Sequence, residues 1–297
     1  MHMENNNTGA SLLQHLYIYN CPSLTCLSSR GHLPKTLQQL VIRDCPKLES
    51  VAERFHNNIS LGFFWIWKCK NLKSIPKGLH NLNRLHEIFI WDCPSLVSFP
   101  EGGLPNTNLR VSIGRCERLK ALPNHVHRLN FLQELKIYRC PSIITFPEEG
   151  FPANITSLSV EDLNIYKPLI EWGLHRLTSL RSLCIIRCPE AVSFPQEEMG
   201  MLLPSSLTEL IIARFLNLRY LSSKGFQNLT SLESLRIRDC PKLTSFPEAG
   251  LPSSLLQLYI NDCPLLKKQC KRYKGLEWSK IAHIPCVKID EKFIYEP

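Results

Sequence analysis

Residues 232–247, LESLRIRDCPKLTSFP, contain the pattern that decides the fold of this chain. In this stretch the residues Leu232, Leu235, Ile237, Cys240 and Leu243 follow the frame Leu-x-x-Leu-x-Ile-x-x-Cys-x-x-Leu. The frame returns at a period of roughly 24 residues, and its ninth position holds Cys21, Cys45, Cys69, Cys93, Cys116, Cys140, Cys188, Cys240 and Cys263. Two more copies, which begin at Ile155 and Leu207, replace the cysteine with Leu163 and Phe215, so the chain holds eleven units.

Each unit is predicted to contribute one short strand, because its segment x-Leu-x-Ile-x alternates apolar and polar positions. The cysteine follows the strand, where its side chain can hydrogen-bond the backbone of the turn. A single unit cannot bury its apolar face alone, so neighbouring units must stack and share a continuous core. This period and spacing are typical of leucine-rich repeats. We therefore predict an α/β repeat solenoid: a leucine-rich-repeat horseshoe with a parallel concave sheet and a mostly irregular, Pro-rich convex side.

The segments that connect the strands alternate between two kinds from residue 76 onward. One kind could hold a helical turn, at residues 78–82, 126–129, 174–177 and 226–229. The other kind contains a proline that disfavours a helix, at residues 103–105, 150–152, 203–205 and 250–252. The structural unit is therefore predicted to be a pair of repeats.

The two ends of the chain differ in pattern. We expect residues 1–12 to be an N-terminal tail or a vector-derived remnant, residues 13–263 to form the solenoid, and residues 264–297 to form a C-terminal cap. The last segment breaks the repeat and offers apolar residues that can cover the final unit: Leu276, Trp278, Ile281, Ile284, Val287 and Ile289. No comparable set precedes Leu13, which predicts that the chain is cut from a longer protein with further sequence upstream.

Cysteine usage favours a reducing compartment. Nine of the thirteen cysteines occupy one repeat position, and equivalent side chains in stacked strands point the same way, which is poor geometry for a disulfide. We therefore predict a structural ladder of buried free thiols. The chain has no Cys-x-x-Cys and its ten His are scattered, so no metal site is expected. Without a signal peptide or an apolar run of membrane length, the expected location is the cytoplasm, with the nucleus as an alternative.

The remaining motifs argue against an enzyme and against a nucleic-acid-binding protein. The net charge of +9 is modest for 297 residues, and its basic residues lie in no nucleic-acid-binding motif. Gly-x-Ser-x-Gly, His-Glu-x-x-His and Gly-x-x-x-x-Gly-Lys-Ser/Thr are all missing from the sequence. We therefore predict no catalytic residues, no cofactor in this chain and no membrane partner.

Three elements together resemble one protein family. They are Cys-Pro-x-Leu-x-Ser-Phe-Pro at residues 93–100 and 240–247, Gly-Leu-Pro-Ser-Ser-Leu at 250–255, and the ending Cys-Pro-Leu-Leu-Lys-Lys at 263–268 with Trp-Ser-Lys-Ile-Ala-His-Ile-Pro at 278–285. They resemble the C-terminal repeats of plant disease resistance proteins of the coiled-coil, nucleotide-binding, leucine-rich-repeat class. The resemblance implies an upstream coiled coil and an ATP/ADP-binding switch domain. It also implies that the repeats recognise pathogen effectors or guarded host proteins and hold the switch domain inactive.

Strand alternation predicts which side chains face the concave solvent. Counting the first Leu of a unit as position one, positions three, five and seven point away from the core. Positions five and seven carry many aromatic and basic residues, and such residues dominate protein-binding hot spots. The predicted partner-binding residues are Tyr17, Tyr19, Arg43, Trp65, Trp67, Phe89, Trp91, Tyr138, Arg236 and Arg238. Three interpretations of the aromatic residues stay open: ligand recognition, contact with the receptor's own switch domain, or strand preference alone.

Two other functional classes stay open at this point. A substrate-recognition subunit of a ubiquitin ligase also uses cysteine-bearing repeats, and an upstream F-box would identify it. An extracellular repeat receptor would need disulfide-bonded caps and usually has Asn at the cysteine position. The leading prediction is a ligand-sensing and autoinhibitory module of an intracellular plant immune receptor.

Overall fold

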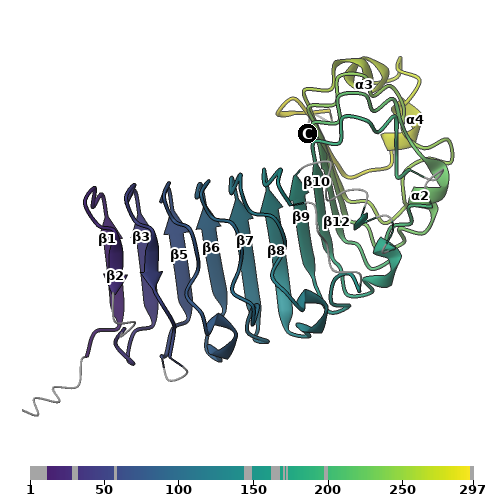
Figure 1. Ribbon diagram of the computed structural model, residues 1–297. Coiled ribbons are helices and arrows are strands. Elements are labelled where there is room, and N and C mark those ends of the chain that lie inside the picture. Colours follow the sequence, from purple (N-terminus) through teal and green to yellow (C-terminus); the bar gives the residue numbers. More distant parts are fainter. Residues whose placement is uncertain are drawn as a thin grey trace, which may run out of the picture.

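The computed structural model describes residues 12–28, 33–56, 59–143, 149–161, 168–169, 171, 173–196 and 200–294. Within these residues, thirteen strands form one sheet in the order β1-β3-β5-β6-β7-β8-β9-β10-β12-β14-β15-β16-β17 (Figure 1). All but the last two are the repeat strands expected from the sequence: β1 His15–Tyr19, β3 Gln39–Arg43, β5 Phe63–Trp67, β6 Glu87–Trp91, β7 Leu109–Gly114, β8 Leu132–Tyr138, β9 Ser157–Glu161, β10 Ser182–Ile186, β12 Glu209–Ala213, β14 Ser234–Arg238 and β15 Gln257–Asn261.

The repeat strands pair in parallel, in a register that places equivalent positions of neighbouring units side by side. Leu40 pairs with Phe64, and Phe64 in turn pairs with Ile88. All three side chains are fully buried, and burying one such side chain contributes about 1.5–3 kcal/mol to folding. One continuous core of these columns runs along the chain behind the sheet. The structure therefore confirms the predicted leucine-rich-repeat solenoid.

The ladder cysteines close the turn that follows each strand. Eight of the nine thiols donate to the carbonyl oxygen two residues earlier, at Sγ–O distances of 3.2–3.7 Å. All thirteen cysteines, each of which lies in the described part of the chain, are free thiols. Cys21 is only half-buried, so the prediction that all nine are buried is wrong for the first unit. No described strand covers the outer side of β1, which leaves this thiol partly open.

The connecting segments on the convex side alternate as predicted. The four segments expected to hold a helical turn contain η1 Leu79–Asn81, η2 Val126–Arg128, η3 Leu174–Arg176 and α2 Ser223–Gln227. The proline-containing segments are turns and irregular backbone. Two short parallel pairs, β2 Cys26–Ser28 with β4 Ser50–Ala52 and β11 Ser193–Phe194 with β13 Tyr220–Leu221, join neighbouring convex segments.

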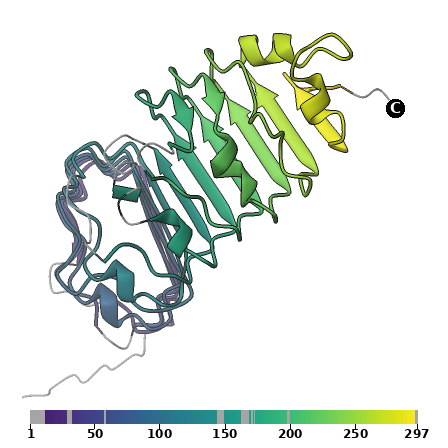
Figure 2. The same cartoon turned by 90° about the vertical axis from the view of Figure 1, so that its right-hand side faces the viewer.

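The solenoid changes direction between β8 and β12. Figure 2 looks along the stack of the first strands while it shows the later strands side by side. Figure 1 shows the same turn as a change in strand orientation after β8. The prediction that positions five and seven face solvent in every unit is wrong at this bend. Ser159, Glu161, Cys184 and Ala213 are buried there, because the turn brings side chains of neighbouring strands over them.

The last residues continue the sheet and add two short helices. β16 Cys286–Ile289 pairs in parallel with β15, and β17 Lys292–Phe293 returns antiparallel to β16. The helices are α3 Pro264–Gln269 and α4 Trp278–Ile281. Of the apolar residues expected to cover the final unit, Leu276 is 81% exposed and does not do so, because it lies in the turn before α4. The others are buried or packed against the core: Trp278, Ile281, Ile284, Val287 and Ile289.

Candidate protein-binding surface

Four aromatic side chains form a continuous row on the concave face, which we call the aromatic belt: Trp65, Phe89, Trp91 and Tyr138. Trp65 on β5 lies 5.8 Å from Phe89 on β6, measured between ring centroids. Phe89 stacks on Trp91 at 5.8 Å with an interplanar angle of 7°. Trp91 reaches Tyr138 on β8 at 5.7 Å. Offset-stacked and tilted rings at such distances stabilise one another by more than the apolar area that they bury. The belt is therefore an ordered apolar strip.

Gly114 on β7 lets Trp91 lie flat across the sheet. A Cβ atom at Gly114 would be 2.4 Å from two carbon atoms of the Trp91 indole, far closer than any real contact. The register places Gly114 beside Trp91 on one side and Tyr138 on the other. The belt therefore crosses β7 only because this unit has no side chain at position seven.

Trp67 lies beside the belt and is covered by cations. Its neighbour in the register is Trp91. The Arg43 guanidinium carbon is 4.2 Å from the Trp67 ring centroid, and Lys68 Nζ is 5.2 Å from it. Asp44 holds the guanidinium in place, with Arg43 Nε 2.8 Å from Asp44 Oδ2. A cation over an indole face is attracted by the ring, so Trp67 and Arg43 stabilise each other's position on the concave face.

Exposure differs along the row. Trp65 is 39% exposed, whereas Phe89, Trp91, Tyr138 and Trp67 are half-buried because the rings and cations cover one another. Burial raises the pKa of the Tyr138 hydroxyl, which also hydrogen-bonds Ser159. Each ring thus keeps part of its surface open to solvent. Adjacent apolar faces of this kind are typical of an interaction surface.

The other predicted partner-binding residues fall into separate groups. Tyr17 and Tyr19 on β1 are 48% and 50% exposed and stack on each other, with β3 between them and the belt. Arg236 on β14 lies over Tyr259, with 5.1 Å from its guanidinium carbon to the ring centroid. Arg238 is different, because it lines the same hollow as Trp91 and Tyr138.

That hollow lies where the solenoid bends, and we call it the bend hollow. It has a volume of about 370 Å³ and is lined by Trp91, Arg115, Tyr138, Arg139, Glu161, Ile186, Ala213, Arg214, Arg238 and Asp239. The lining comes from every repeat strand between β6 and β14 or from the residue that follows it. Strands spaced about 4.8 Å apart in a flat sheet could not bring these side chains together. The bend hollow is therefore a product of the curvature.

Three arginines converge on one buried carboxylate at the bend. The Glu161 side chain is 7% exposed, and its Oε1 lies 3.1 Å from Arg139 Nε, 3.5 Å from Arg214 Nη1 and 3.9 Å from Arg187 Nη1. Each arginine directly follows a strand and has a positive φ. These arginines lie outside positions five and seven, from which the binding residues were predicted. The available signal was the eighth position, which holds Arg115, Arg139, Arg187 and Arg214 in four of five consecutive units.

Burial makes three of the ladder cysteines unreactive. Burial raises the pKa of the Cys69 thiol to about 11 and that of the Cys93 and Cys188 thiols to about 12. Since the thiolate is the nucleophile and the metal ligand, these groups are inert near neutral pH. Within the described ranges, no group of three or more His, Cys, Asp or Glu could hold a metal ion. No helix in the described part of the chain is long and apolar enough to span a bilayer.

The fold and the concave surface define a leucine-rich-repeat module. The chain is 35% identical over 138 residues to "Putative disease resistance protein At3g14460" of Arabidopsis thaliana. This similarity confirms the resemblance to plant disease resistance proteins. The match covers 46% of this chain and 9% of the relative's length.

The other comparisons add less. No protein family model matches the chain. A solved structure, "Structure of Leptospira interrogans LRR protein LIC12759", aligns over 91% of this chain and 96% of its own, with 14% sequence identity and a TM-score of 0.26. Because this TM-score is low, the fold is assigned from the parallel repeat strands of the chain itself.

Proposed function

We propose that this chain is the ligand-sensing and autoinhibitory repeat module of an intracellular plant immune receptor. The observation that carries the proposal is the aromatic belt, with Trp67 and Arg43 beside it, on the concave face of a solenoid similar to a disease resistance protein. The core does not require aromatic residues at these positions, because Ser, Lys and Asn occupy the same columns in other units. Leaving the rings open to water costs about 25 cal/mol per Å² of apolar area, which a partner would recover.

The proposed partner is a protein: a pathogen effector, a guarded host protein or the receptor's own nucleotide-binding domain. Solenoids bind through extended concave surfaces, and the belt offers stacked rings with a cationic neighbour, the residue types that dominate hot spots. ATP or ADP would bind in another domain of the receptor. A substrate-recognition subunit of a ubiquitin ligase is the second candidate, but the similarity to a disease resistance protein favours the immune receptor.

Proximity labelling in plant cells tests this proposal. A biotin ligase is fused to the wild-type chain, to a Trp65→Ala/Trp67→Ala variant and to Tyr220→Ala. Tyr220 is an aromatic control, 42% exposed, on the convex strand β13. We expect the belt variant to lose labelled proteins that the wild type and the control keep, with normal unfolding curves for all three. Identical labelling by the three chains would contradict recognition through the belt.

A second assay separates an external ligand from the receptor's own switch domain. The same variants are placed in the full receptor and expressed without a pathogen. Cell death in the belt variant alone would identify the belt as an autoinhibitory contact. Loss of the pathogen response without spontaneous cell death would identify it as a ligand-binding surface.

A further inference from the structure

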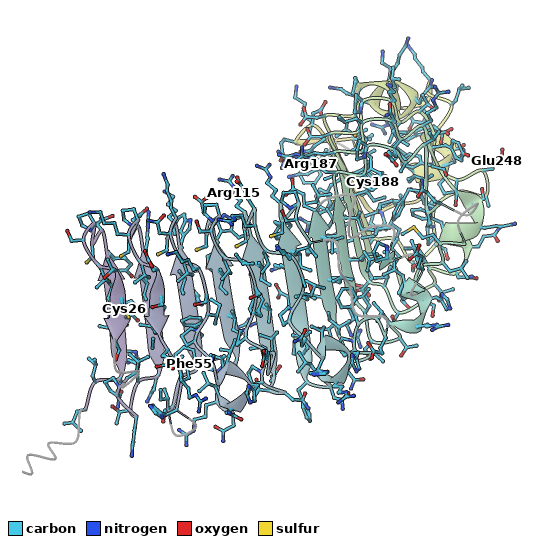
Figure 3. The ribbon with its side chains drawn as sticks, viewed as in Figure 1. Cys26, Phe55, Arg115, Arg187, Cys188 and Glu248 are labelled. Carbon is cyan, nitrogen blue, oxygen red and sulfur yellow. The ribbon has the colours of Figure 1, made fainter. Side chains whose placement is uncertain are left out.

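The concave rim carries excess positive charge where the solenoid bends. The residues that line the bend hollow include four arginines and two carboxylates, so four minus two leaves two positive charges uncompensated. Arg187, on the same rim, adds a third. Figure 3 shows Arg115 and Arg187 at the upper edge of the sheet, beyond the carboxyl ends of the strands. Arg115 also lines a neighbouring hollow, together with Asp92 and Glu117.

The guanidinium groups keep hydrogen-bond donors available. A guanidinium has five N–H donors, and Arg139, Arg187 and Arg214 each approach Glu161 with one nitrogen. Their side chains are 39%, 50% and 43% exposed. Arg214 also approaches Asp239, with 3.8 Å from its Nε to Asp239 Oδ2. Arg115 is exposed and forms no ion pair with any described carboxylate. Glu161 therefore holds these arginines close together but leaves most of their N–H donors without a carboxylate partner.

The remaining lining is apolar. Ile186 and Ala213 line the bend hollow together with Trp91 and Tyr138, which form the end of the aromatic belt. A volume of about 370 Å³ accepts one or two side chains and not a folded element. The best occupant thus carries a carboxylate beside an apolar group.

The rim on either side of the bend selects against an extended polyanion. The residue that follows the strand is Asp44 after β3, Asp92 after β6, Asp239 after β14 and Asp262 after β15. A nucleic-acid backbone that ran along the rim would meet these carboxylates, whereas a compact acidic anchor in the bend hollow would meet four arginines against two carboxylates. Charge complementarity of this kind fixes which partner binds and in what position.

We propose that the bend hollow is the anchor site for an acidic side chain of the protein partner, carried next to an apolar residue. This inference rests on the proposed function, because it names the chemistry of the partner that the concave face binds. The partner's Asp or Glu would pair with Arg115 in the hollow and with Arg187 on the rim beside it, and its apolar neighbour would contact Ile186 and Trp91. The aromatic belt would then bind the adjoining part of the same partner.

Fluorescence anisotropy on the whole 297-residue chain tests the anchor site. The probe is a labelled peptide of alternating Asp and Leu, compared with the same peptide carrying Asn for Asp. We expect the Asp peptide to bind about tenfold more tightly, and Arg115→Gln/Arg187→Gln to weaken it about tenfold. The matched control Arg219→Gln, an exposed arginine outside the bend hollow, should change binding less than about twofold. Raising the salt concentration should weaken binding of the Asp peptide.

Three results would overturn the anchor site. They are equal binding of the two peptides, no effect of the double variant while its unfolding curve is normal, and tighter binding of a single-stranded oligonucleotide of the same length. Proximity labelling with the double variant separates this inference from the proposed function. Partners lost by the Trp65→Ala/Trp67→Ala variant but kept by Arg115→Gln/Arg187→Gln would refute the anchor and leave the proposed function standing. Partners kept by both would refute both.

Discussion

Single residues at two repeat positions have opposite roles. The ninth position supports the turn after the strand in most units, because the buried thiol donates to a carbonyl of its own turn, as Cys93 does to Trp91. Before the bend, the seventh position lies on the concave side of the sheet, so the units can place Tyr19, Arg43, Trp67 or Gly114 there without loss of stacking. Function can thus change at position seven while position nine is kept.

The buried thiols predict that the protein loses stability at alkaline pH. Burial raises the pKa of Cys69 to about 11 and of Cys93 to about 12, from an ordinary value of 9.0. The folded state then holds its protons while the unfolded state releases them. The stability is therefore full below about pH 9 and falls as the pH rises towards 12. Urea midpoints between pH 7 and pH 11 measure the fall.

The control for the alkaline effect is a Cys69→Ala/Cys93→Ala variant. It should be less stable at pH 7, because it loses buried volume, but its stability should fall less steeply above pH 9. An equally steep fall would show that these two thiols do not cause the loss of stability.

Gly114→Ala is predicted to displace Trp91 while the core stays intact. The new methyl group would meet the indole at 2.4 Å, and Gly114 has an ordinary negative φ, so the backbone itself accepts alanine. We expect a change in tryptophan fluorescence and a change of less than about 1 kcal/mol in the free energy of unfolding. The same substitution in a Trp91→Phe background should leave the spectrum unchanged. Ser112→Ala on the same strand is the control, and a spectral shift there would contradict this explanation.

The sequence predicts well which repeat positions are buried, but it predicts poorly which side chains of different units touch. Leu235 and Ile237 are buried as their frame requires, because strand alternation is a local property. The contact of Trp91 with Gly114 depends on which units are neighbours and on ring orientation. The convergence on Glu161 depends on the curvature of the whole stack. Neither property follows from the spacing of apolar residues in one unit.

At the scale of elements, the segment after β15 is joined to the preceding unit by one buried charge. Glu277 Oε2 accepts the N–H of Phe246 at 2.8 Å and lies 3.1 Å from Lys280 Nζ. Its side chain is 9% exposed, so its bonds are made where water competes little. Phe246 is buried in the preceding convex segment. Glu277 thus fastens α4 to the convex side of the solenoid.

We predict that Glu277→Ala lowers the free energy of unfolding by about 2 kcal/mol, because a charge-assisted hydrogen bond to a buried N–H is lost. Protection of the α4 amides against hydrogen exchange should fall with it. Glu49→Ala is the control: Glu49 pairs with Lys73 at 2.8 Å, but the two side chains are 52% and 64% exposed. A surface pair of this kind contributes about 0–1 kcal/mol. Equal losses for the two variants would show that Glu277 is not a fastening point.

At the scale of the whole molecule, the bend divides the concave face into two surfaces. The first strands, β1 to β8, present aromatic rings, and the later strands present arginines and buried small side chains. The two surfaces meet in the bend hollow, where Trp91 and Arg238 line one space although they lie on β6 and β14. A partner held there would touch both halves at once, so the curvature itself contributes to recognition.

The last prediction concerns the charge that holds this curvature. Glu161→Gln removes the carboxylate to which Arg139, Arg187 and Arg214 converge from the ends of β8, β10 and β12. Three guanidinium groups would then lie close together with only Asp239, 3.8 Å from Arg214 Nε, as a counter-charge, so the strand ends should move apart. We expect a loss of about 2–3 kcal/mol in the free energy of unfolding, typical of hydrogen bonds to a charged group.

Small-angle scattering should show that the Glu161→Gln variant is more extended, and added salt should reverse part of the change by screening the arginines. Glu87→Gln is the control, because Glu87 pairs with Arg110 at 3.2 Å outside the bend and its side chain is 21% exposed. The control should keep the wild-type scattering curve. If Glu161→Gln also keeps the wild-type scattering curve and the wild-type stability, apolar packing alone sets the bend. The arginines would then lie close together as a result of the curvature and would not maintain it.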